Sequence, residues 1–315
     1  MGNWTQAPNS DFILVGLLNN KGRLSTILST LISITFFVAL TGNSTMMVLI
    51  HIAPELHTPM YFLLSHLSLM DAMYICTTVP KMMVDQLTGQ KTISFLGCTA
   101  QIFLYLTLLG AECFLLGIMA YDRYVAISHP LRYPVLMSLR RCVQMAAGSW
   151  LLGATDGFMI TPIAMSFPYC GSRVINSFFC EVPALLKLSC IDTSVYETVM
   201  YVCCILMLLG PFTLIAFSYS QIAAIVAGMR SAHARKKALA TCSSHLIVVS
   251  LFYGATIFTY MLPNSYHIPG QDRVVPVFYT ILTPALNPVI YGLRNKQVTG
   301  ALWKILQRCT SIQRM

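Results

Sequence analysis

Long runs of apolar residues, separated by short polar connections, recur along the whole chain. A helix needs about 20 predominantly apolar residues to cross a hydrocarbon core about 30 Å thick. The pattern predicts a membrane helix in each of seven stretches: 27–50, 59–79, 98–121, 143–165, 195–226, 238–262 and 274–291. We therefore expect an all-α membrane protein, built as a bundle of seven transmembrane helices.

The composition supports this interpretation. Of the 315 residues, 56% are hydrophobic and only 10% are charged, whereas roughly 25% are charged in soluble chains. A soluble fold of this size could not cover its surface with so few charged residues. The composition also excludes a disordered, a collagen-like and a nucleic-acid-binding protein, and the net charge of +9 therefore has to be explained by topology.

The basic residues are sorted by membrane side. Thirteen of the twenty Lys and Arg residues fall on one side of the predicted bundle: Arg123, Arg132, Arg140, Arg141, Arg230, Arg235, Lys236, Lys237, Arg294, Lys296, Lys304, Arg308 and Arg314. Cytoplasmic loops carry such an excess, so we expect this side to face the cytoplasm and the N-terminus to lie outside. The expected divisions are an extracellular N-terminus (1–26), the seven-helix domain (27–291) and a cytoplasmic tail (292–315).

Features at both ends agree with this orientation. Asn3 begins an Asn-Trp-Thr sequon, and it is expected to carry a glycan on the outer side. In the tail, residues 295–309 place three cations opposite apolar side chains, which predicts an amphipathic helix on the inner leaflet. The two faces are formed by Lys296, Lys304 and Arg308 on one side and Leu302, Trp303 and Leu306 on the other.

Four cysteines cluster on the predicted outer side, where disulfides persist: Cys98, Cys170, Cys180 and Cys190. Four cysteines allow three connectivities. A bridge from Cys98 to either Cys180 or Cys190 would tie the long loop after the fourth span over the third helix.

Three acids lie inside predicted spans, where each costs about 2.5–3.5 kcal/mol on insertion scales. Glu112 follows Cys98 by about 21 Å of helix, so it and Asp71 are expected near mid-membrane. Together with Asn43 and Asn287 they form a possible sodium site. The alternative is a neutral carboxyl pair that shares a proton without metal. Asp156 could face either lipid or the bundle, and the sequence assigns it no role.

Four sequence blocks, in this order and spacing, resemble those of olfactory receptors, a branch of the rhodopsin-like G-protein-coupled receptors. They read LHTPMYF at 56–62, MAYDRYVAI at 119–127, KALATCSSHL at 237–246 and PALNPVIY at 284–291, and Ser218-Tyr219 agrees with them. One departure is Ser128, where the family usually has Cys.

The resemblance implies a function, which stands here as an expectation. An odorant receptor at the plasma membrane would bind a small volatile ligand in the outer half of the bundle and activate a stimulatory G protein to raise cAMP, with no cofactor required. It also implies disulfides Cys98–Cys180 and Cys170–Cys190. The competing class is a transporter or channel, although no inverted repeat is visible. An enzyme is not expected, because no nucleophile and base occur at reactive spacing.

The resemblance assigns signalling roles to two groups of residues. Asp122, Arg123 and Tyr124 are expected to form a latch at the cytoplasmic end of the third helix, although the pair could merely mark a helix end. Asn287 and Pro288 are expected to form a hinge, since proline frees a backbone carbonyl. Tyr219 and Tyr291 are expected to meet near Arg123 during activation, with ordinary packing as the alternative.

Depth and helical phase predict the ligand site, because residues three or four apart share a helix face. The candidates are Tyr105, Leu106, Leu109 and Gly110 on the third helix, Cys203 and Met207 on the fifth, Tyr253, Thr256, Ile257 and Tyr260 on the sixth, and Val277 and Thr280 on the seventh. A mainly apolar site with a few hydroxyls suits a neutral volatile molecule. For any single apolar member, ordinary packing between helices is the alternative.

Overall fold

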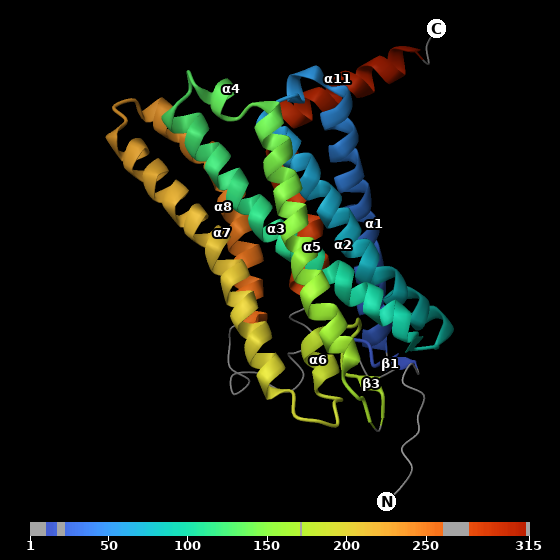
Figure 1. Ribbon diagram of the computed structural model, residues 1–315. Helices are drawn as coiled ribbons and strands as arrows, with labels where there is room; N and C mark the ends of the chain where they lie inside the picture. The colour runs from blue at the N-terminus through green and yellow to red at the C-terminus, as the bar shows by residue number, and fades with distance from the viewer. Residues whose placement is uncertain (1–10, 18–22, 171, 261–276, 313–315) are drawn as a thin grey trace, which may run out of the picture.

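The computed structural model describes residues 11–17, 23–170, 172–260 and 277–312, and these form a bundle of long helices (Figure 1). The long helices are α1 (Arg23–Ile52), α2 (Pro59–Thr88), α3 (Phe95–Ser128), α5 (Leu139–Ser166), α7 (Ser194–Gly228) and α8 (Ala232–Tyr260). A last segment consists of η4 (Phe278–Leu282), α10 (Thr283–Pro288) and η5 (Val289–Leu293). Shorter elements are η1 (Pro54–Leu56), α4 (Tyr133–Leu136), α6 (Val182–Leu186) and α11 (Lys296–Ile312).

Five of these helices, α1, α2, α3, α7 and α8, are long and apolar enough to cross a membrane. The fourth predicted span coincides with α5, whose 28 residues make about 42 Å of helix. The seventh coincides with η4, α10 and η5, except that 274–276 lie outside the described residues. Leu31, Phe37 and Leu151 are more than half exposed on the outside of the bundle, as expected for side chains that face lipid.

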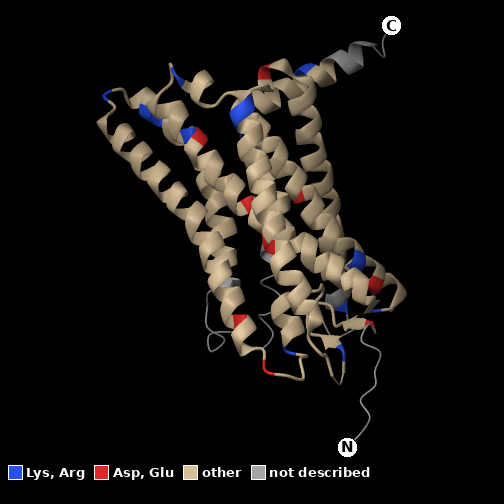
Figure 2. Cartoon of the chain, in the orientation of Figure 1, with Lys and Arg blue, Asp and Glu red and all other residues tan. Residues whose placement is uncertain are grey.

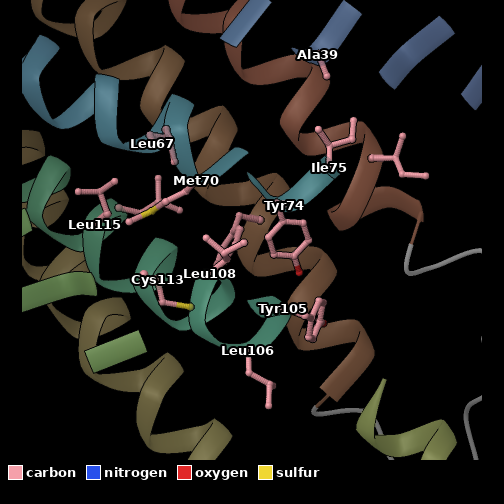
Figure 3. Packing of buried hydrophobic residues seen from close by; sticks show 14 of the residues in the cluster. Ala39, Leu67, Met70, Tyr74, Ile75, Tyr105, Leu106, Leu108, Cys113 and Leu115 are labelled. Carbon is pink, nitrogen blue, oxygen red and sulfur yellow. The ribbon is translucent and has the colours of Figure 1, made fainter. Parts of the chain in front are cut away.

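The helices are packed unevenly. In the most apolar window of α3, 72% of the residues are buried, whereas the figure for α7 is 17%. α3 therefore lies at the centre of the bundle, and α7 lies at its edge with most side chains facing outward. Figure 3 shows part of the centre, where Leu67, Met70 and Tyr74 of α2 face Tyr105 and Leu108 of α3.

Two glycines bring α5 and α3 into direct backbone contact. A Cβ atom added to Gly153 would lie 2.2 Å from the carbonyl oxygen of Thr107, and one added to Gly157 would lie 2.5 Å from the Thr107 Oγ1 atom. Small residues four apart are a common interface between membrane helices, because they let the backbones approach closely. The Gly153-x-x-x-Gly157 spacing in the sequence is the signal for this contact.

A small three-stranded sheet covers one end of the bundle, which we call the sheet end. β1 (Phe12–Leu14) pairs antiparallel with β2 (Thr92–Ile93) and parallel with β3 (Val174–Ile175). Phe12 is fully buried, and the Lys91 ammonium donates a hydrogen bond of 2.7 Å to the carbonyl oxygen of Val15. The N-terminal segment is thus part of the folded structure at this end, which the sequence did not predict.

Two disulfides lie at the sheet end. They join Cys98 to Cys180 and Cys170 to Cys190, which is the pairing implied by the resemblance; the competing Cys98–Cys190 bridge is not formed. The first bridge holds the segment between α5 and α7 against α3.

The opposite end carries α11 (Figure 1), and we call it the α11 end. The predicted tail helix is present here. The Lys304 ammonium pairs with the Glu55 carboxylate at 2.8 Å, and the Tyr61 hydroxyl donates to the Gln297 side chain at 2.7 Å. α11 is thereby attached to η1 and α2. The side chains of Arg308 and Cys309 lie outside the described residues.

Candidate functional site

The predicted ligand residues nearest the sheet end lie beneath the loop between α5 and α7. Tyr105 is buried, with its ring centroid 5.5 Å from that of Tyr74 on α2 and 5.4 Å from that of Phe179 in the loop. The Gln101 side chain accepts a 2.7 Å hydrogen bond from the Cys180 backbone N–H and donates one of 2.8 Å to the Thr77 carbonyl. The loop, α3 and α2 are therefore bound together above Tyr105.

Deeper in the bundle, predicted ligand residues from three helices converge. A Cβ added to Gly110 of α3 would lie 3.3 Å from the Met207 Cε atom of α7. The Tyr253 hydroxyl of α8 donates to the Cys113 carbonyl of α3 at 3.4 Å, and the Tyr253 ring packs on Phe212 of α7. The structure thus brings Gly110, Met207 and Tyr253 to one region, as the helical phase predicted.

The other candidates differ in their burial. Leu106, Thr256 and Thr280 are buried, whereas Leu109, Cys203 and Val277 are half-buried. Ile257 is 40% exposed, whereas the adjacent Thr256 is 2% exposed. Successive helix residues are rotated by about 100°, and this rotation carries Ile257 toward the outer surface of α8. The Tyr260 side chain lies outside what the structure describes, as does Asn3.

Three acids occupy the middle of the bundle, with no Lys or Arg beside them in the part of the chain that is described (Figure 2). The Asp71 carboxylate accepts a 2.9 Å hydrogen bond from the Asn287 amide. The Asn43 amide donates to the Ala39 and Pro284 carbonyls at 3.0 and 2.9 Å. Both asparagines therefore direct their N–H donors to protein acceptors.

Four buried oxygens in this region have no hydrogen-bond partner among the described residues: Asp71 Oδ1, Glu112 Oε1, Asn43 Oδ1 and Asn287 Oδ1. All four are hard oxygen donors of the kind that alkali and alkaline-earth cations prefer, so the residues fit the predicted sodium ion. No cluster of three or more His, Cys, Asp or Glu side chains that could hold a metal ion occurs in the described ranges, so an ion here would need the asparagine oxygens in addition to the two carboxylates.

Asp156, which the sequence could not orient, faces the bundle. It is 7% exposed, and its Cβ atom would lie 3.9 Å from a Cβ added to Gly110. Its Oδ1 atom has no hydrogen-bond partner among the described residues. The close contact made by Gly153 and Gly157 sets this orientation, because Asp156 precedes Gly157 on α5.

At the α11 end, Arg123 is held by Asp122 in an ion pair, with the Arg123 Nε atom 3.0 Å from Asp122 Oδ2. The other carboxylate oxygen accepts a 2.7 Å hydrogen bond from the Tyr133 hydroxyl of α4. Burial, together with the neighbouring Asp122 carboxylate, raises the pKa of Tyr133, so the phenol stays protonated and donates. Sequence reasoning missed Tyr133, because it lies in a connection between two spans.

A buried histidine links three helices close to the Arg123–Asp122 pair, on the side toward the middle of the bundle. The Tyr219 hydroxyl of α7 and His245 Nδ1 of α8 share a hydrogen bond of 2.8 Å, and His245 Nε2 lies 3.2 Å from the Leu116 carbonyl oxygen of α3. Sequence reasoning also missed His245, although it belongs to the quoted block at 237–246. Tyr219 is therefore bonded to His245 in this structure and makes no described hydrogen bond to Arg123.

The remaining predicted signalling residues lie along the last segment and at the end of α3. Pro288 packs against α1, where a Cβ on Gly42 would lie 3.0 Å from the Pro288 ring. The helix changes from α to π geometry directly after Pro288, which is a local irregularity at the predicted hinge. The Tyr291 hydroxyl is buried without a partner among the described residues. The half-buried Tyr124 packs its ring on Phe217 of α7.

The family model and similar curated proteins point to the same family. The family model described as "Olfactory receptor" matches residues 32–309. Among curated human proteins, olfactory receptor 2T1 is 64% identical over 98% of this chain and 83% of its own length. Olfactory receptor 2T27 is 62% identical over 96% of this chain and 95% of its own, and olfactory receptor 2T11 is 57% identical over 99% and 98%.

Proposed function

Since this chain belongs to the olfactory receptor family, we propose that it acts as an odorant receptor at the plasma membrane and signals through a stimulatory G protein to raise cAMP. It is a multi-pass membrane protein and not an enzyme. In this proposal the sheet end is extracellular and the α11 end is cytoplasmic, in agreement with the distribution of Lys and Arg. The observation that carries it is the buried Arg123–Asp122 pair, closed by Tyr133, at the α11 end of a chain of this family.

The proposed ligand is a small volatile molecule in the outer half of the bundle. There it would contact residues from α3, α7 and α8, among them Gly110, Met207 and Tyr253. α7 and α8 are linked to α3 through Tyr219, His245 and the Leu116 carbonyl. A ligand that moves α7 or α8 relative to α3 would strain these hydrogen bonds and favour release of Arg123 toward the G protein.

We further propose that a sodium ion binds between Asp71 and Glu112 when the receptor is inactive. The four unpartnered oxygens would contribute its protein ligands, and the ion's single positive charge would offset one of the two buried carboxylate charges. No other cofactor is proposed.

The direct test is a cAMP assay in cells with and without the α subunit of the stimulatory G protein, using a chemically diverse odorant panel. A receptor gives a ligand-dependent rise in cAMP only when the G protein is present. A transporter or channel would instead move odorant or ions across the membrane in both cell lines, and that result would contradict the proposal.

Substitutions at the proposed ligand site should change potency without changing the surface level. Leu109→Trp adds bulk to a half-buried position on α3, and Tyr253→Phe removes a hydroxyl that bonds α3. We expect each, like Tyr260→Phe, to shift the half-maximal odorant concentration about tenfold, which corresponds to about 1.4 kcal/mol of binding free energy. The matched control is Ile257→Trp on the exposed side of α8, which should leave potency within about twofold. If the odorant potency of all four variants equals that of the parent, the ligand binds elsewhere.

Removing the Tyr133 hydroxyl should raise ligand-independent signalling. A hydrogen bond of this kind contributes about 0.5–1.5 kcal/mol, so Tyr133→Phe should increase basal cAMP by about two- to tenfold at equal surface level. Tyr121→Phe serves as a control, because its hydroxyl makes no described hydrogen bond. Basal cAMP that is the same in both variants would show that Tyr133 does not restrain the pair.

The sodium proposal predicts ion-dependent stability. Replacing choline by sodium should raise the thermal midpoint of the purified protein by several degrees, because an ion present at 100 times its Kd contributes about 2.7 kcal/mol. The double variant Asp71→Asn/Glu112→Gln should lose this dependence while it remains folded. A midpoint that does not respond to sodium in the parent would favour the proton-sharing pair.

A further inference from the structure

A basic groove of about 460 Å³ lies at the α11 end, between the first turns of α8 and the residue that follows η5. Its cations are Arg235 and Lys236 on α8 and Arg294 after η5, and its apolar wall includes Leu239 and Ala240. Pockets of about 300–1,000 Å³ hold small-molecule ligands. The volume therefore suits a polar headgroup.

Within the described residues, none of the three cations in this groove is paired with an acid. In the part of the chain that the structure describes, the ion pairs at this end are Arg123–Asp122 and Lys304–Glu55, and no acid lines the groove. Clustered charges of one sign in a recess attract ions of the opposite sign. The groove therefore favours an anionic occupant.

The position of the groove relative to the membrane favours a lipid. Leu239 is 54% exposed and lies on a helix that is apolar enough to cross a membrane. This wall of the groove is therefore expected to continue onto a surface that faces acyl chains. Trp303 of α11 is 65% exposed, and tryptophan prefers the membrane interface. The groove accordingly lies near headgroup depth, where a soluble anion would leave Leu239 without a partner.

We propose that this groove binds the headgroup of a polyphosphorylated inositol lipid. The cations come from two separate elements, so a headgroup with several phosphates can bridge α8 and Arg294, whereas a singly charged headgroup can pair with only one element. Basic recesses between membrane helices on the cytoplasmic side are typical sites for such headgroups. This inference rests on the orientation in the proposed function, in which the α11 end is cytoplasmic, but it does not require G-protein signalling.

The test measures binding of fluorescent phosphatidylinositol 4,5-bisphosphate to the full chain in phosphatidylcholine nanodiscs. Each basic residue near the surface contributes about 1 kcal/mol, or about fivefold, so Arg235→Gln/Arg294→Gln should weaken binding at least tenfold. The matched control is Arg132→Gln/Arg140→Gln, which removes the same charge from exposed positions outside the groove and should change binding by less than about twofold. Both variants must keep the parent's unfolding midpoint in plain phosphatidylcholine.

Several outcomes would overturn the proposal. An equal loss in both double variants would show that the lipid responds only to overall charge. Competition by phosphatidylserine at equal total charge, or binding of soluble inositol trisphosphate as tight as that of the lipid, would remove the specific lipid site. Unchanged lipid binding with weakened G-protein activation in Arg235→Gln/Arg294→Gln would assign the groove to the G-protein interface. If that variant fails to fold, a photoreactive form of the lipid can be crosslinked to the parent chain instead. Adducts are expected at residues 235–243 and 294, and adducts only elsewhere would contradict the proposal.

Discussion

Replacing Gly153 with Val should abolish delivery of the protein to the cell surface. The new Cβ would lie 2.2 Å from the Thr107 carbonyl oxygen and 2.5 Å from the Ala111 backbone nitrogen. These are backbone atoms of α3, which cannot rotate away as a side chain does, so α5 and α3 would have to separate. Overpacking usually costs about 1–3 kcal/mol of stability and sometimes more. We expect the cost of Gly153→Val to lie at or above the upper end of this range.

The same helix offers a graded set of controls for this prediction. A Cβ on Gly148 meets no atom within 4 Å, whereas one on Gly157 meets the Thr107 Oγ1 atom, which can rotate, and the Phe103 carbonyl at 3.0 Å. Surface labelling should therefore decrease from Gly148→Val through Gly157→Val to Gly153→Val. If Gly153→Val and Gly148→Val reach the surface equally, the close contact between α5 and α3 is not required for folding.

Replacing Arg123 with Ala should abolish the odorant-driven rise in cAMP while the protein still reaches the surface. In the structure this guanidinium is 8% exposed and paired with Asp122, and in the proposed active state it is the group that the G protein contacts. The signal should fall at least about 30-fold, because a charge that pairs across a buried interface is worth about 2–5 kcal/mol when truncated.

The control for Arg123 must separate signalling from stability. Asp122 keeps its hydrogen bond from Tyr133 after the substitution, which limits the cost of leaving a buried carboxylate without its cation. Arg132→Ala removes an exposed cation at the same end and should leave both cAMP and surface level near those of the parent. Normal signalling by a well-expressed Arg123→Ala protein would rule out the latch.

The positions of the helices along the chain followed from the sequence because the membrane imposes a length and an apolar composition on each span. Contacts that depend on a few atoms did not follow. β1 has only three residues, and its burial depends on β2 and β3, which are distant in the sequence. The orientation of Asp156 depends on the contact of α5 with α3, and the Gly153-x-x-x-Gly157 spacing was the signal that could have revealed it.

For the ligand site, helical phase predicted the convergence of Gly110, Met207 and Tyr253 but did not predict the exposure of Ile257. Phase places a residue to within about one position, and Ile257 lies one position beyond the buried Thr256. His245 and Tyr133 were missed for another reason. Each acts through a partner on a different element, and one sequence cannot show which side chains meet in space.

The uneven packing of the helices bears on how a molecule of very few atoms can operate a protein of this size. The smallest ligands gain at most about 1.5 kcal/mol per non-hydrogen atom, so the work available to an odorant is small. α3 has 72% of its most apolar window buried, so moving it would break many contacts; α7 has 17%, so moving it would break fewer. We therefore expect a small volatile molecule to act by shifting α7, which is less buried than α3.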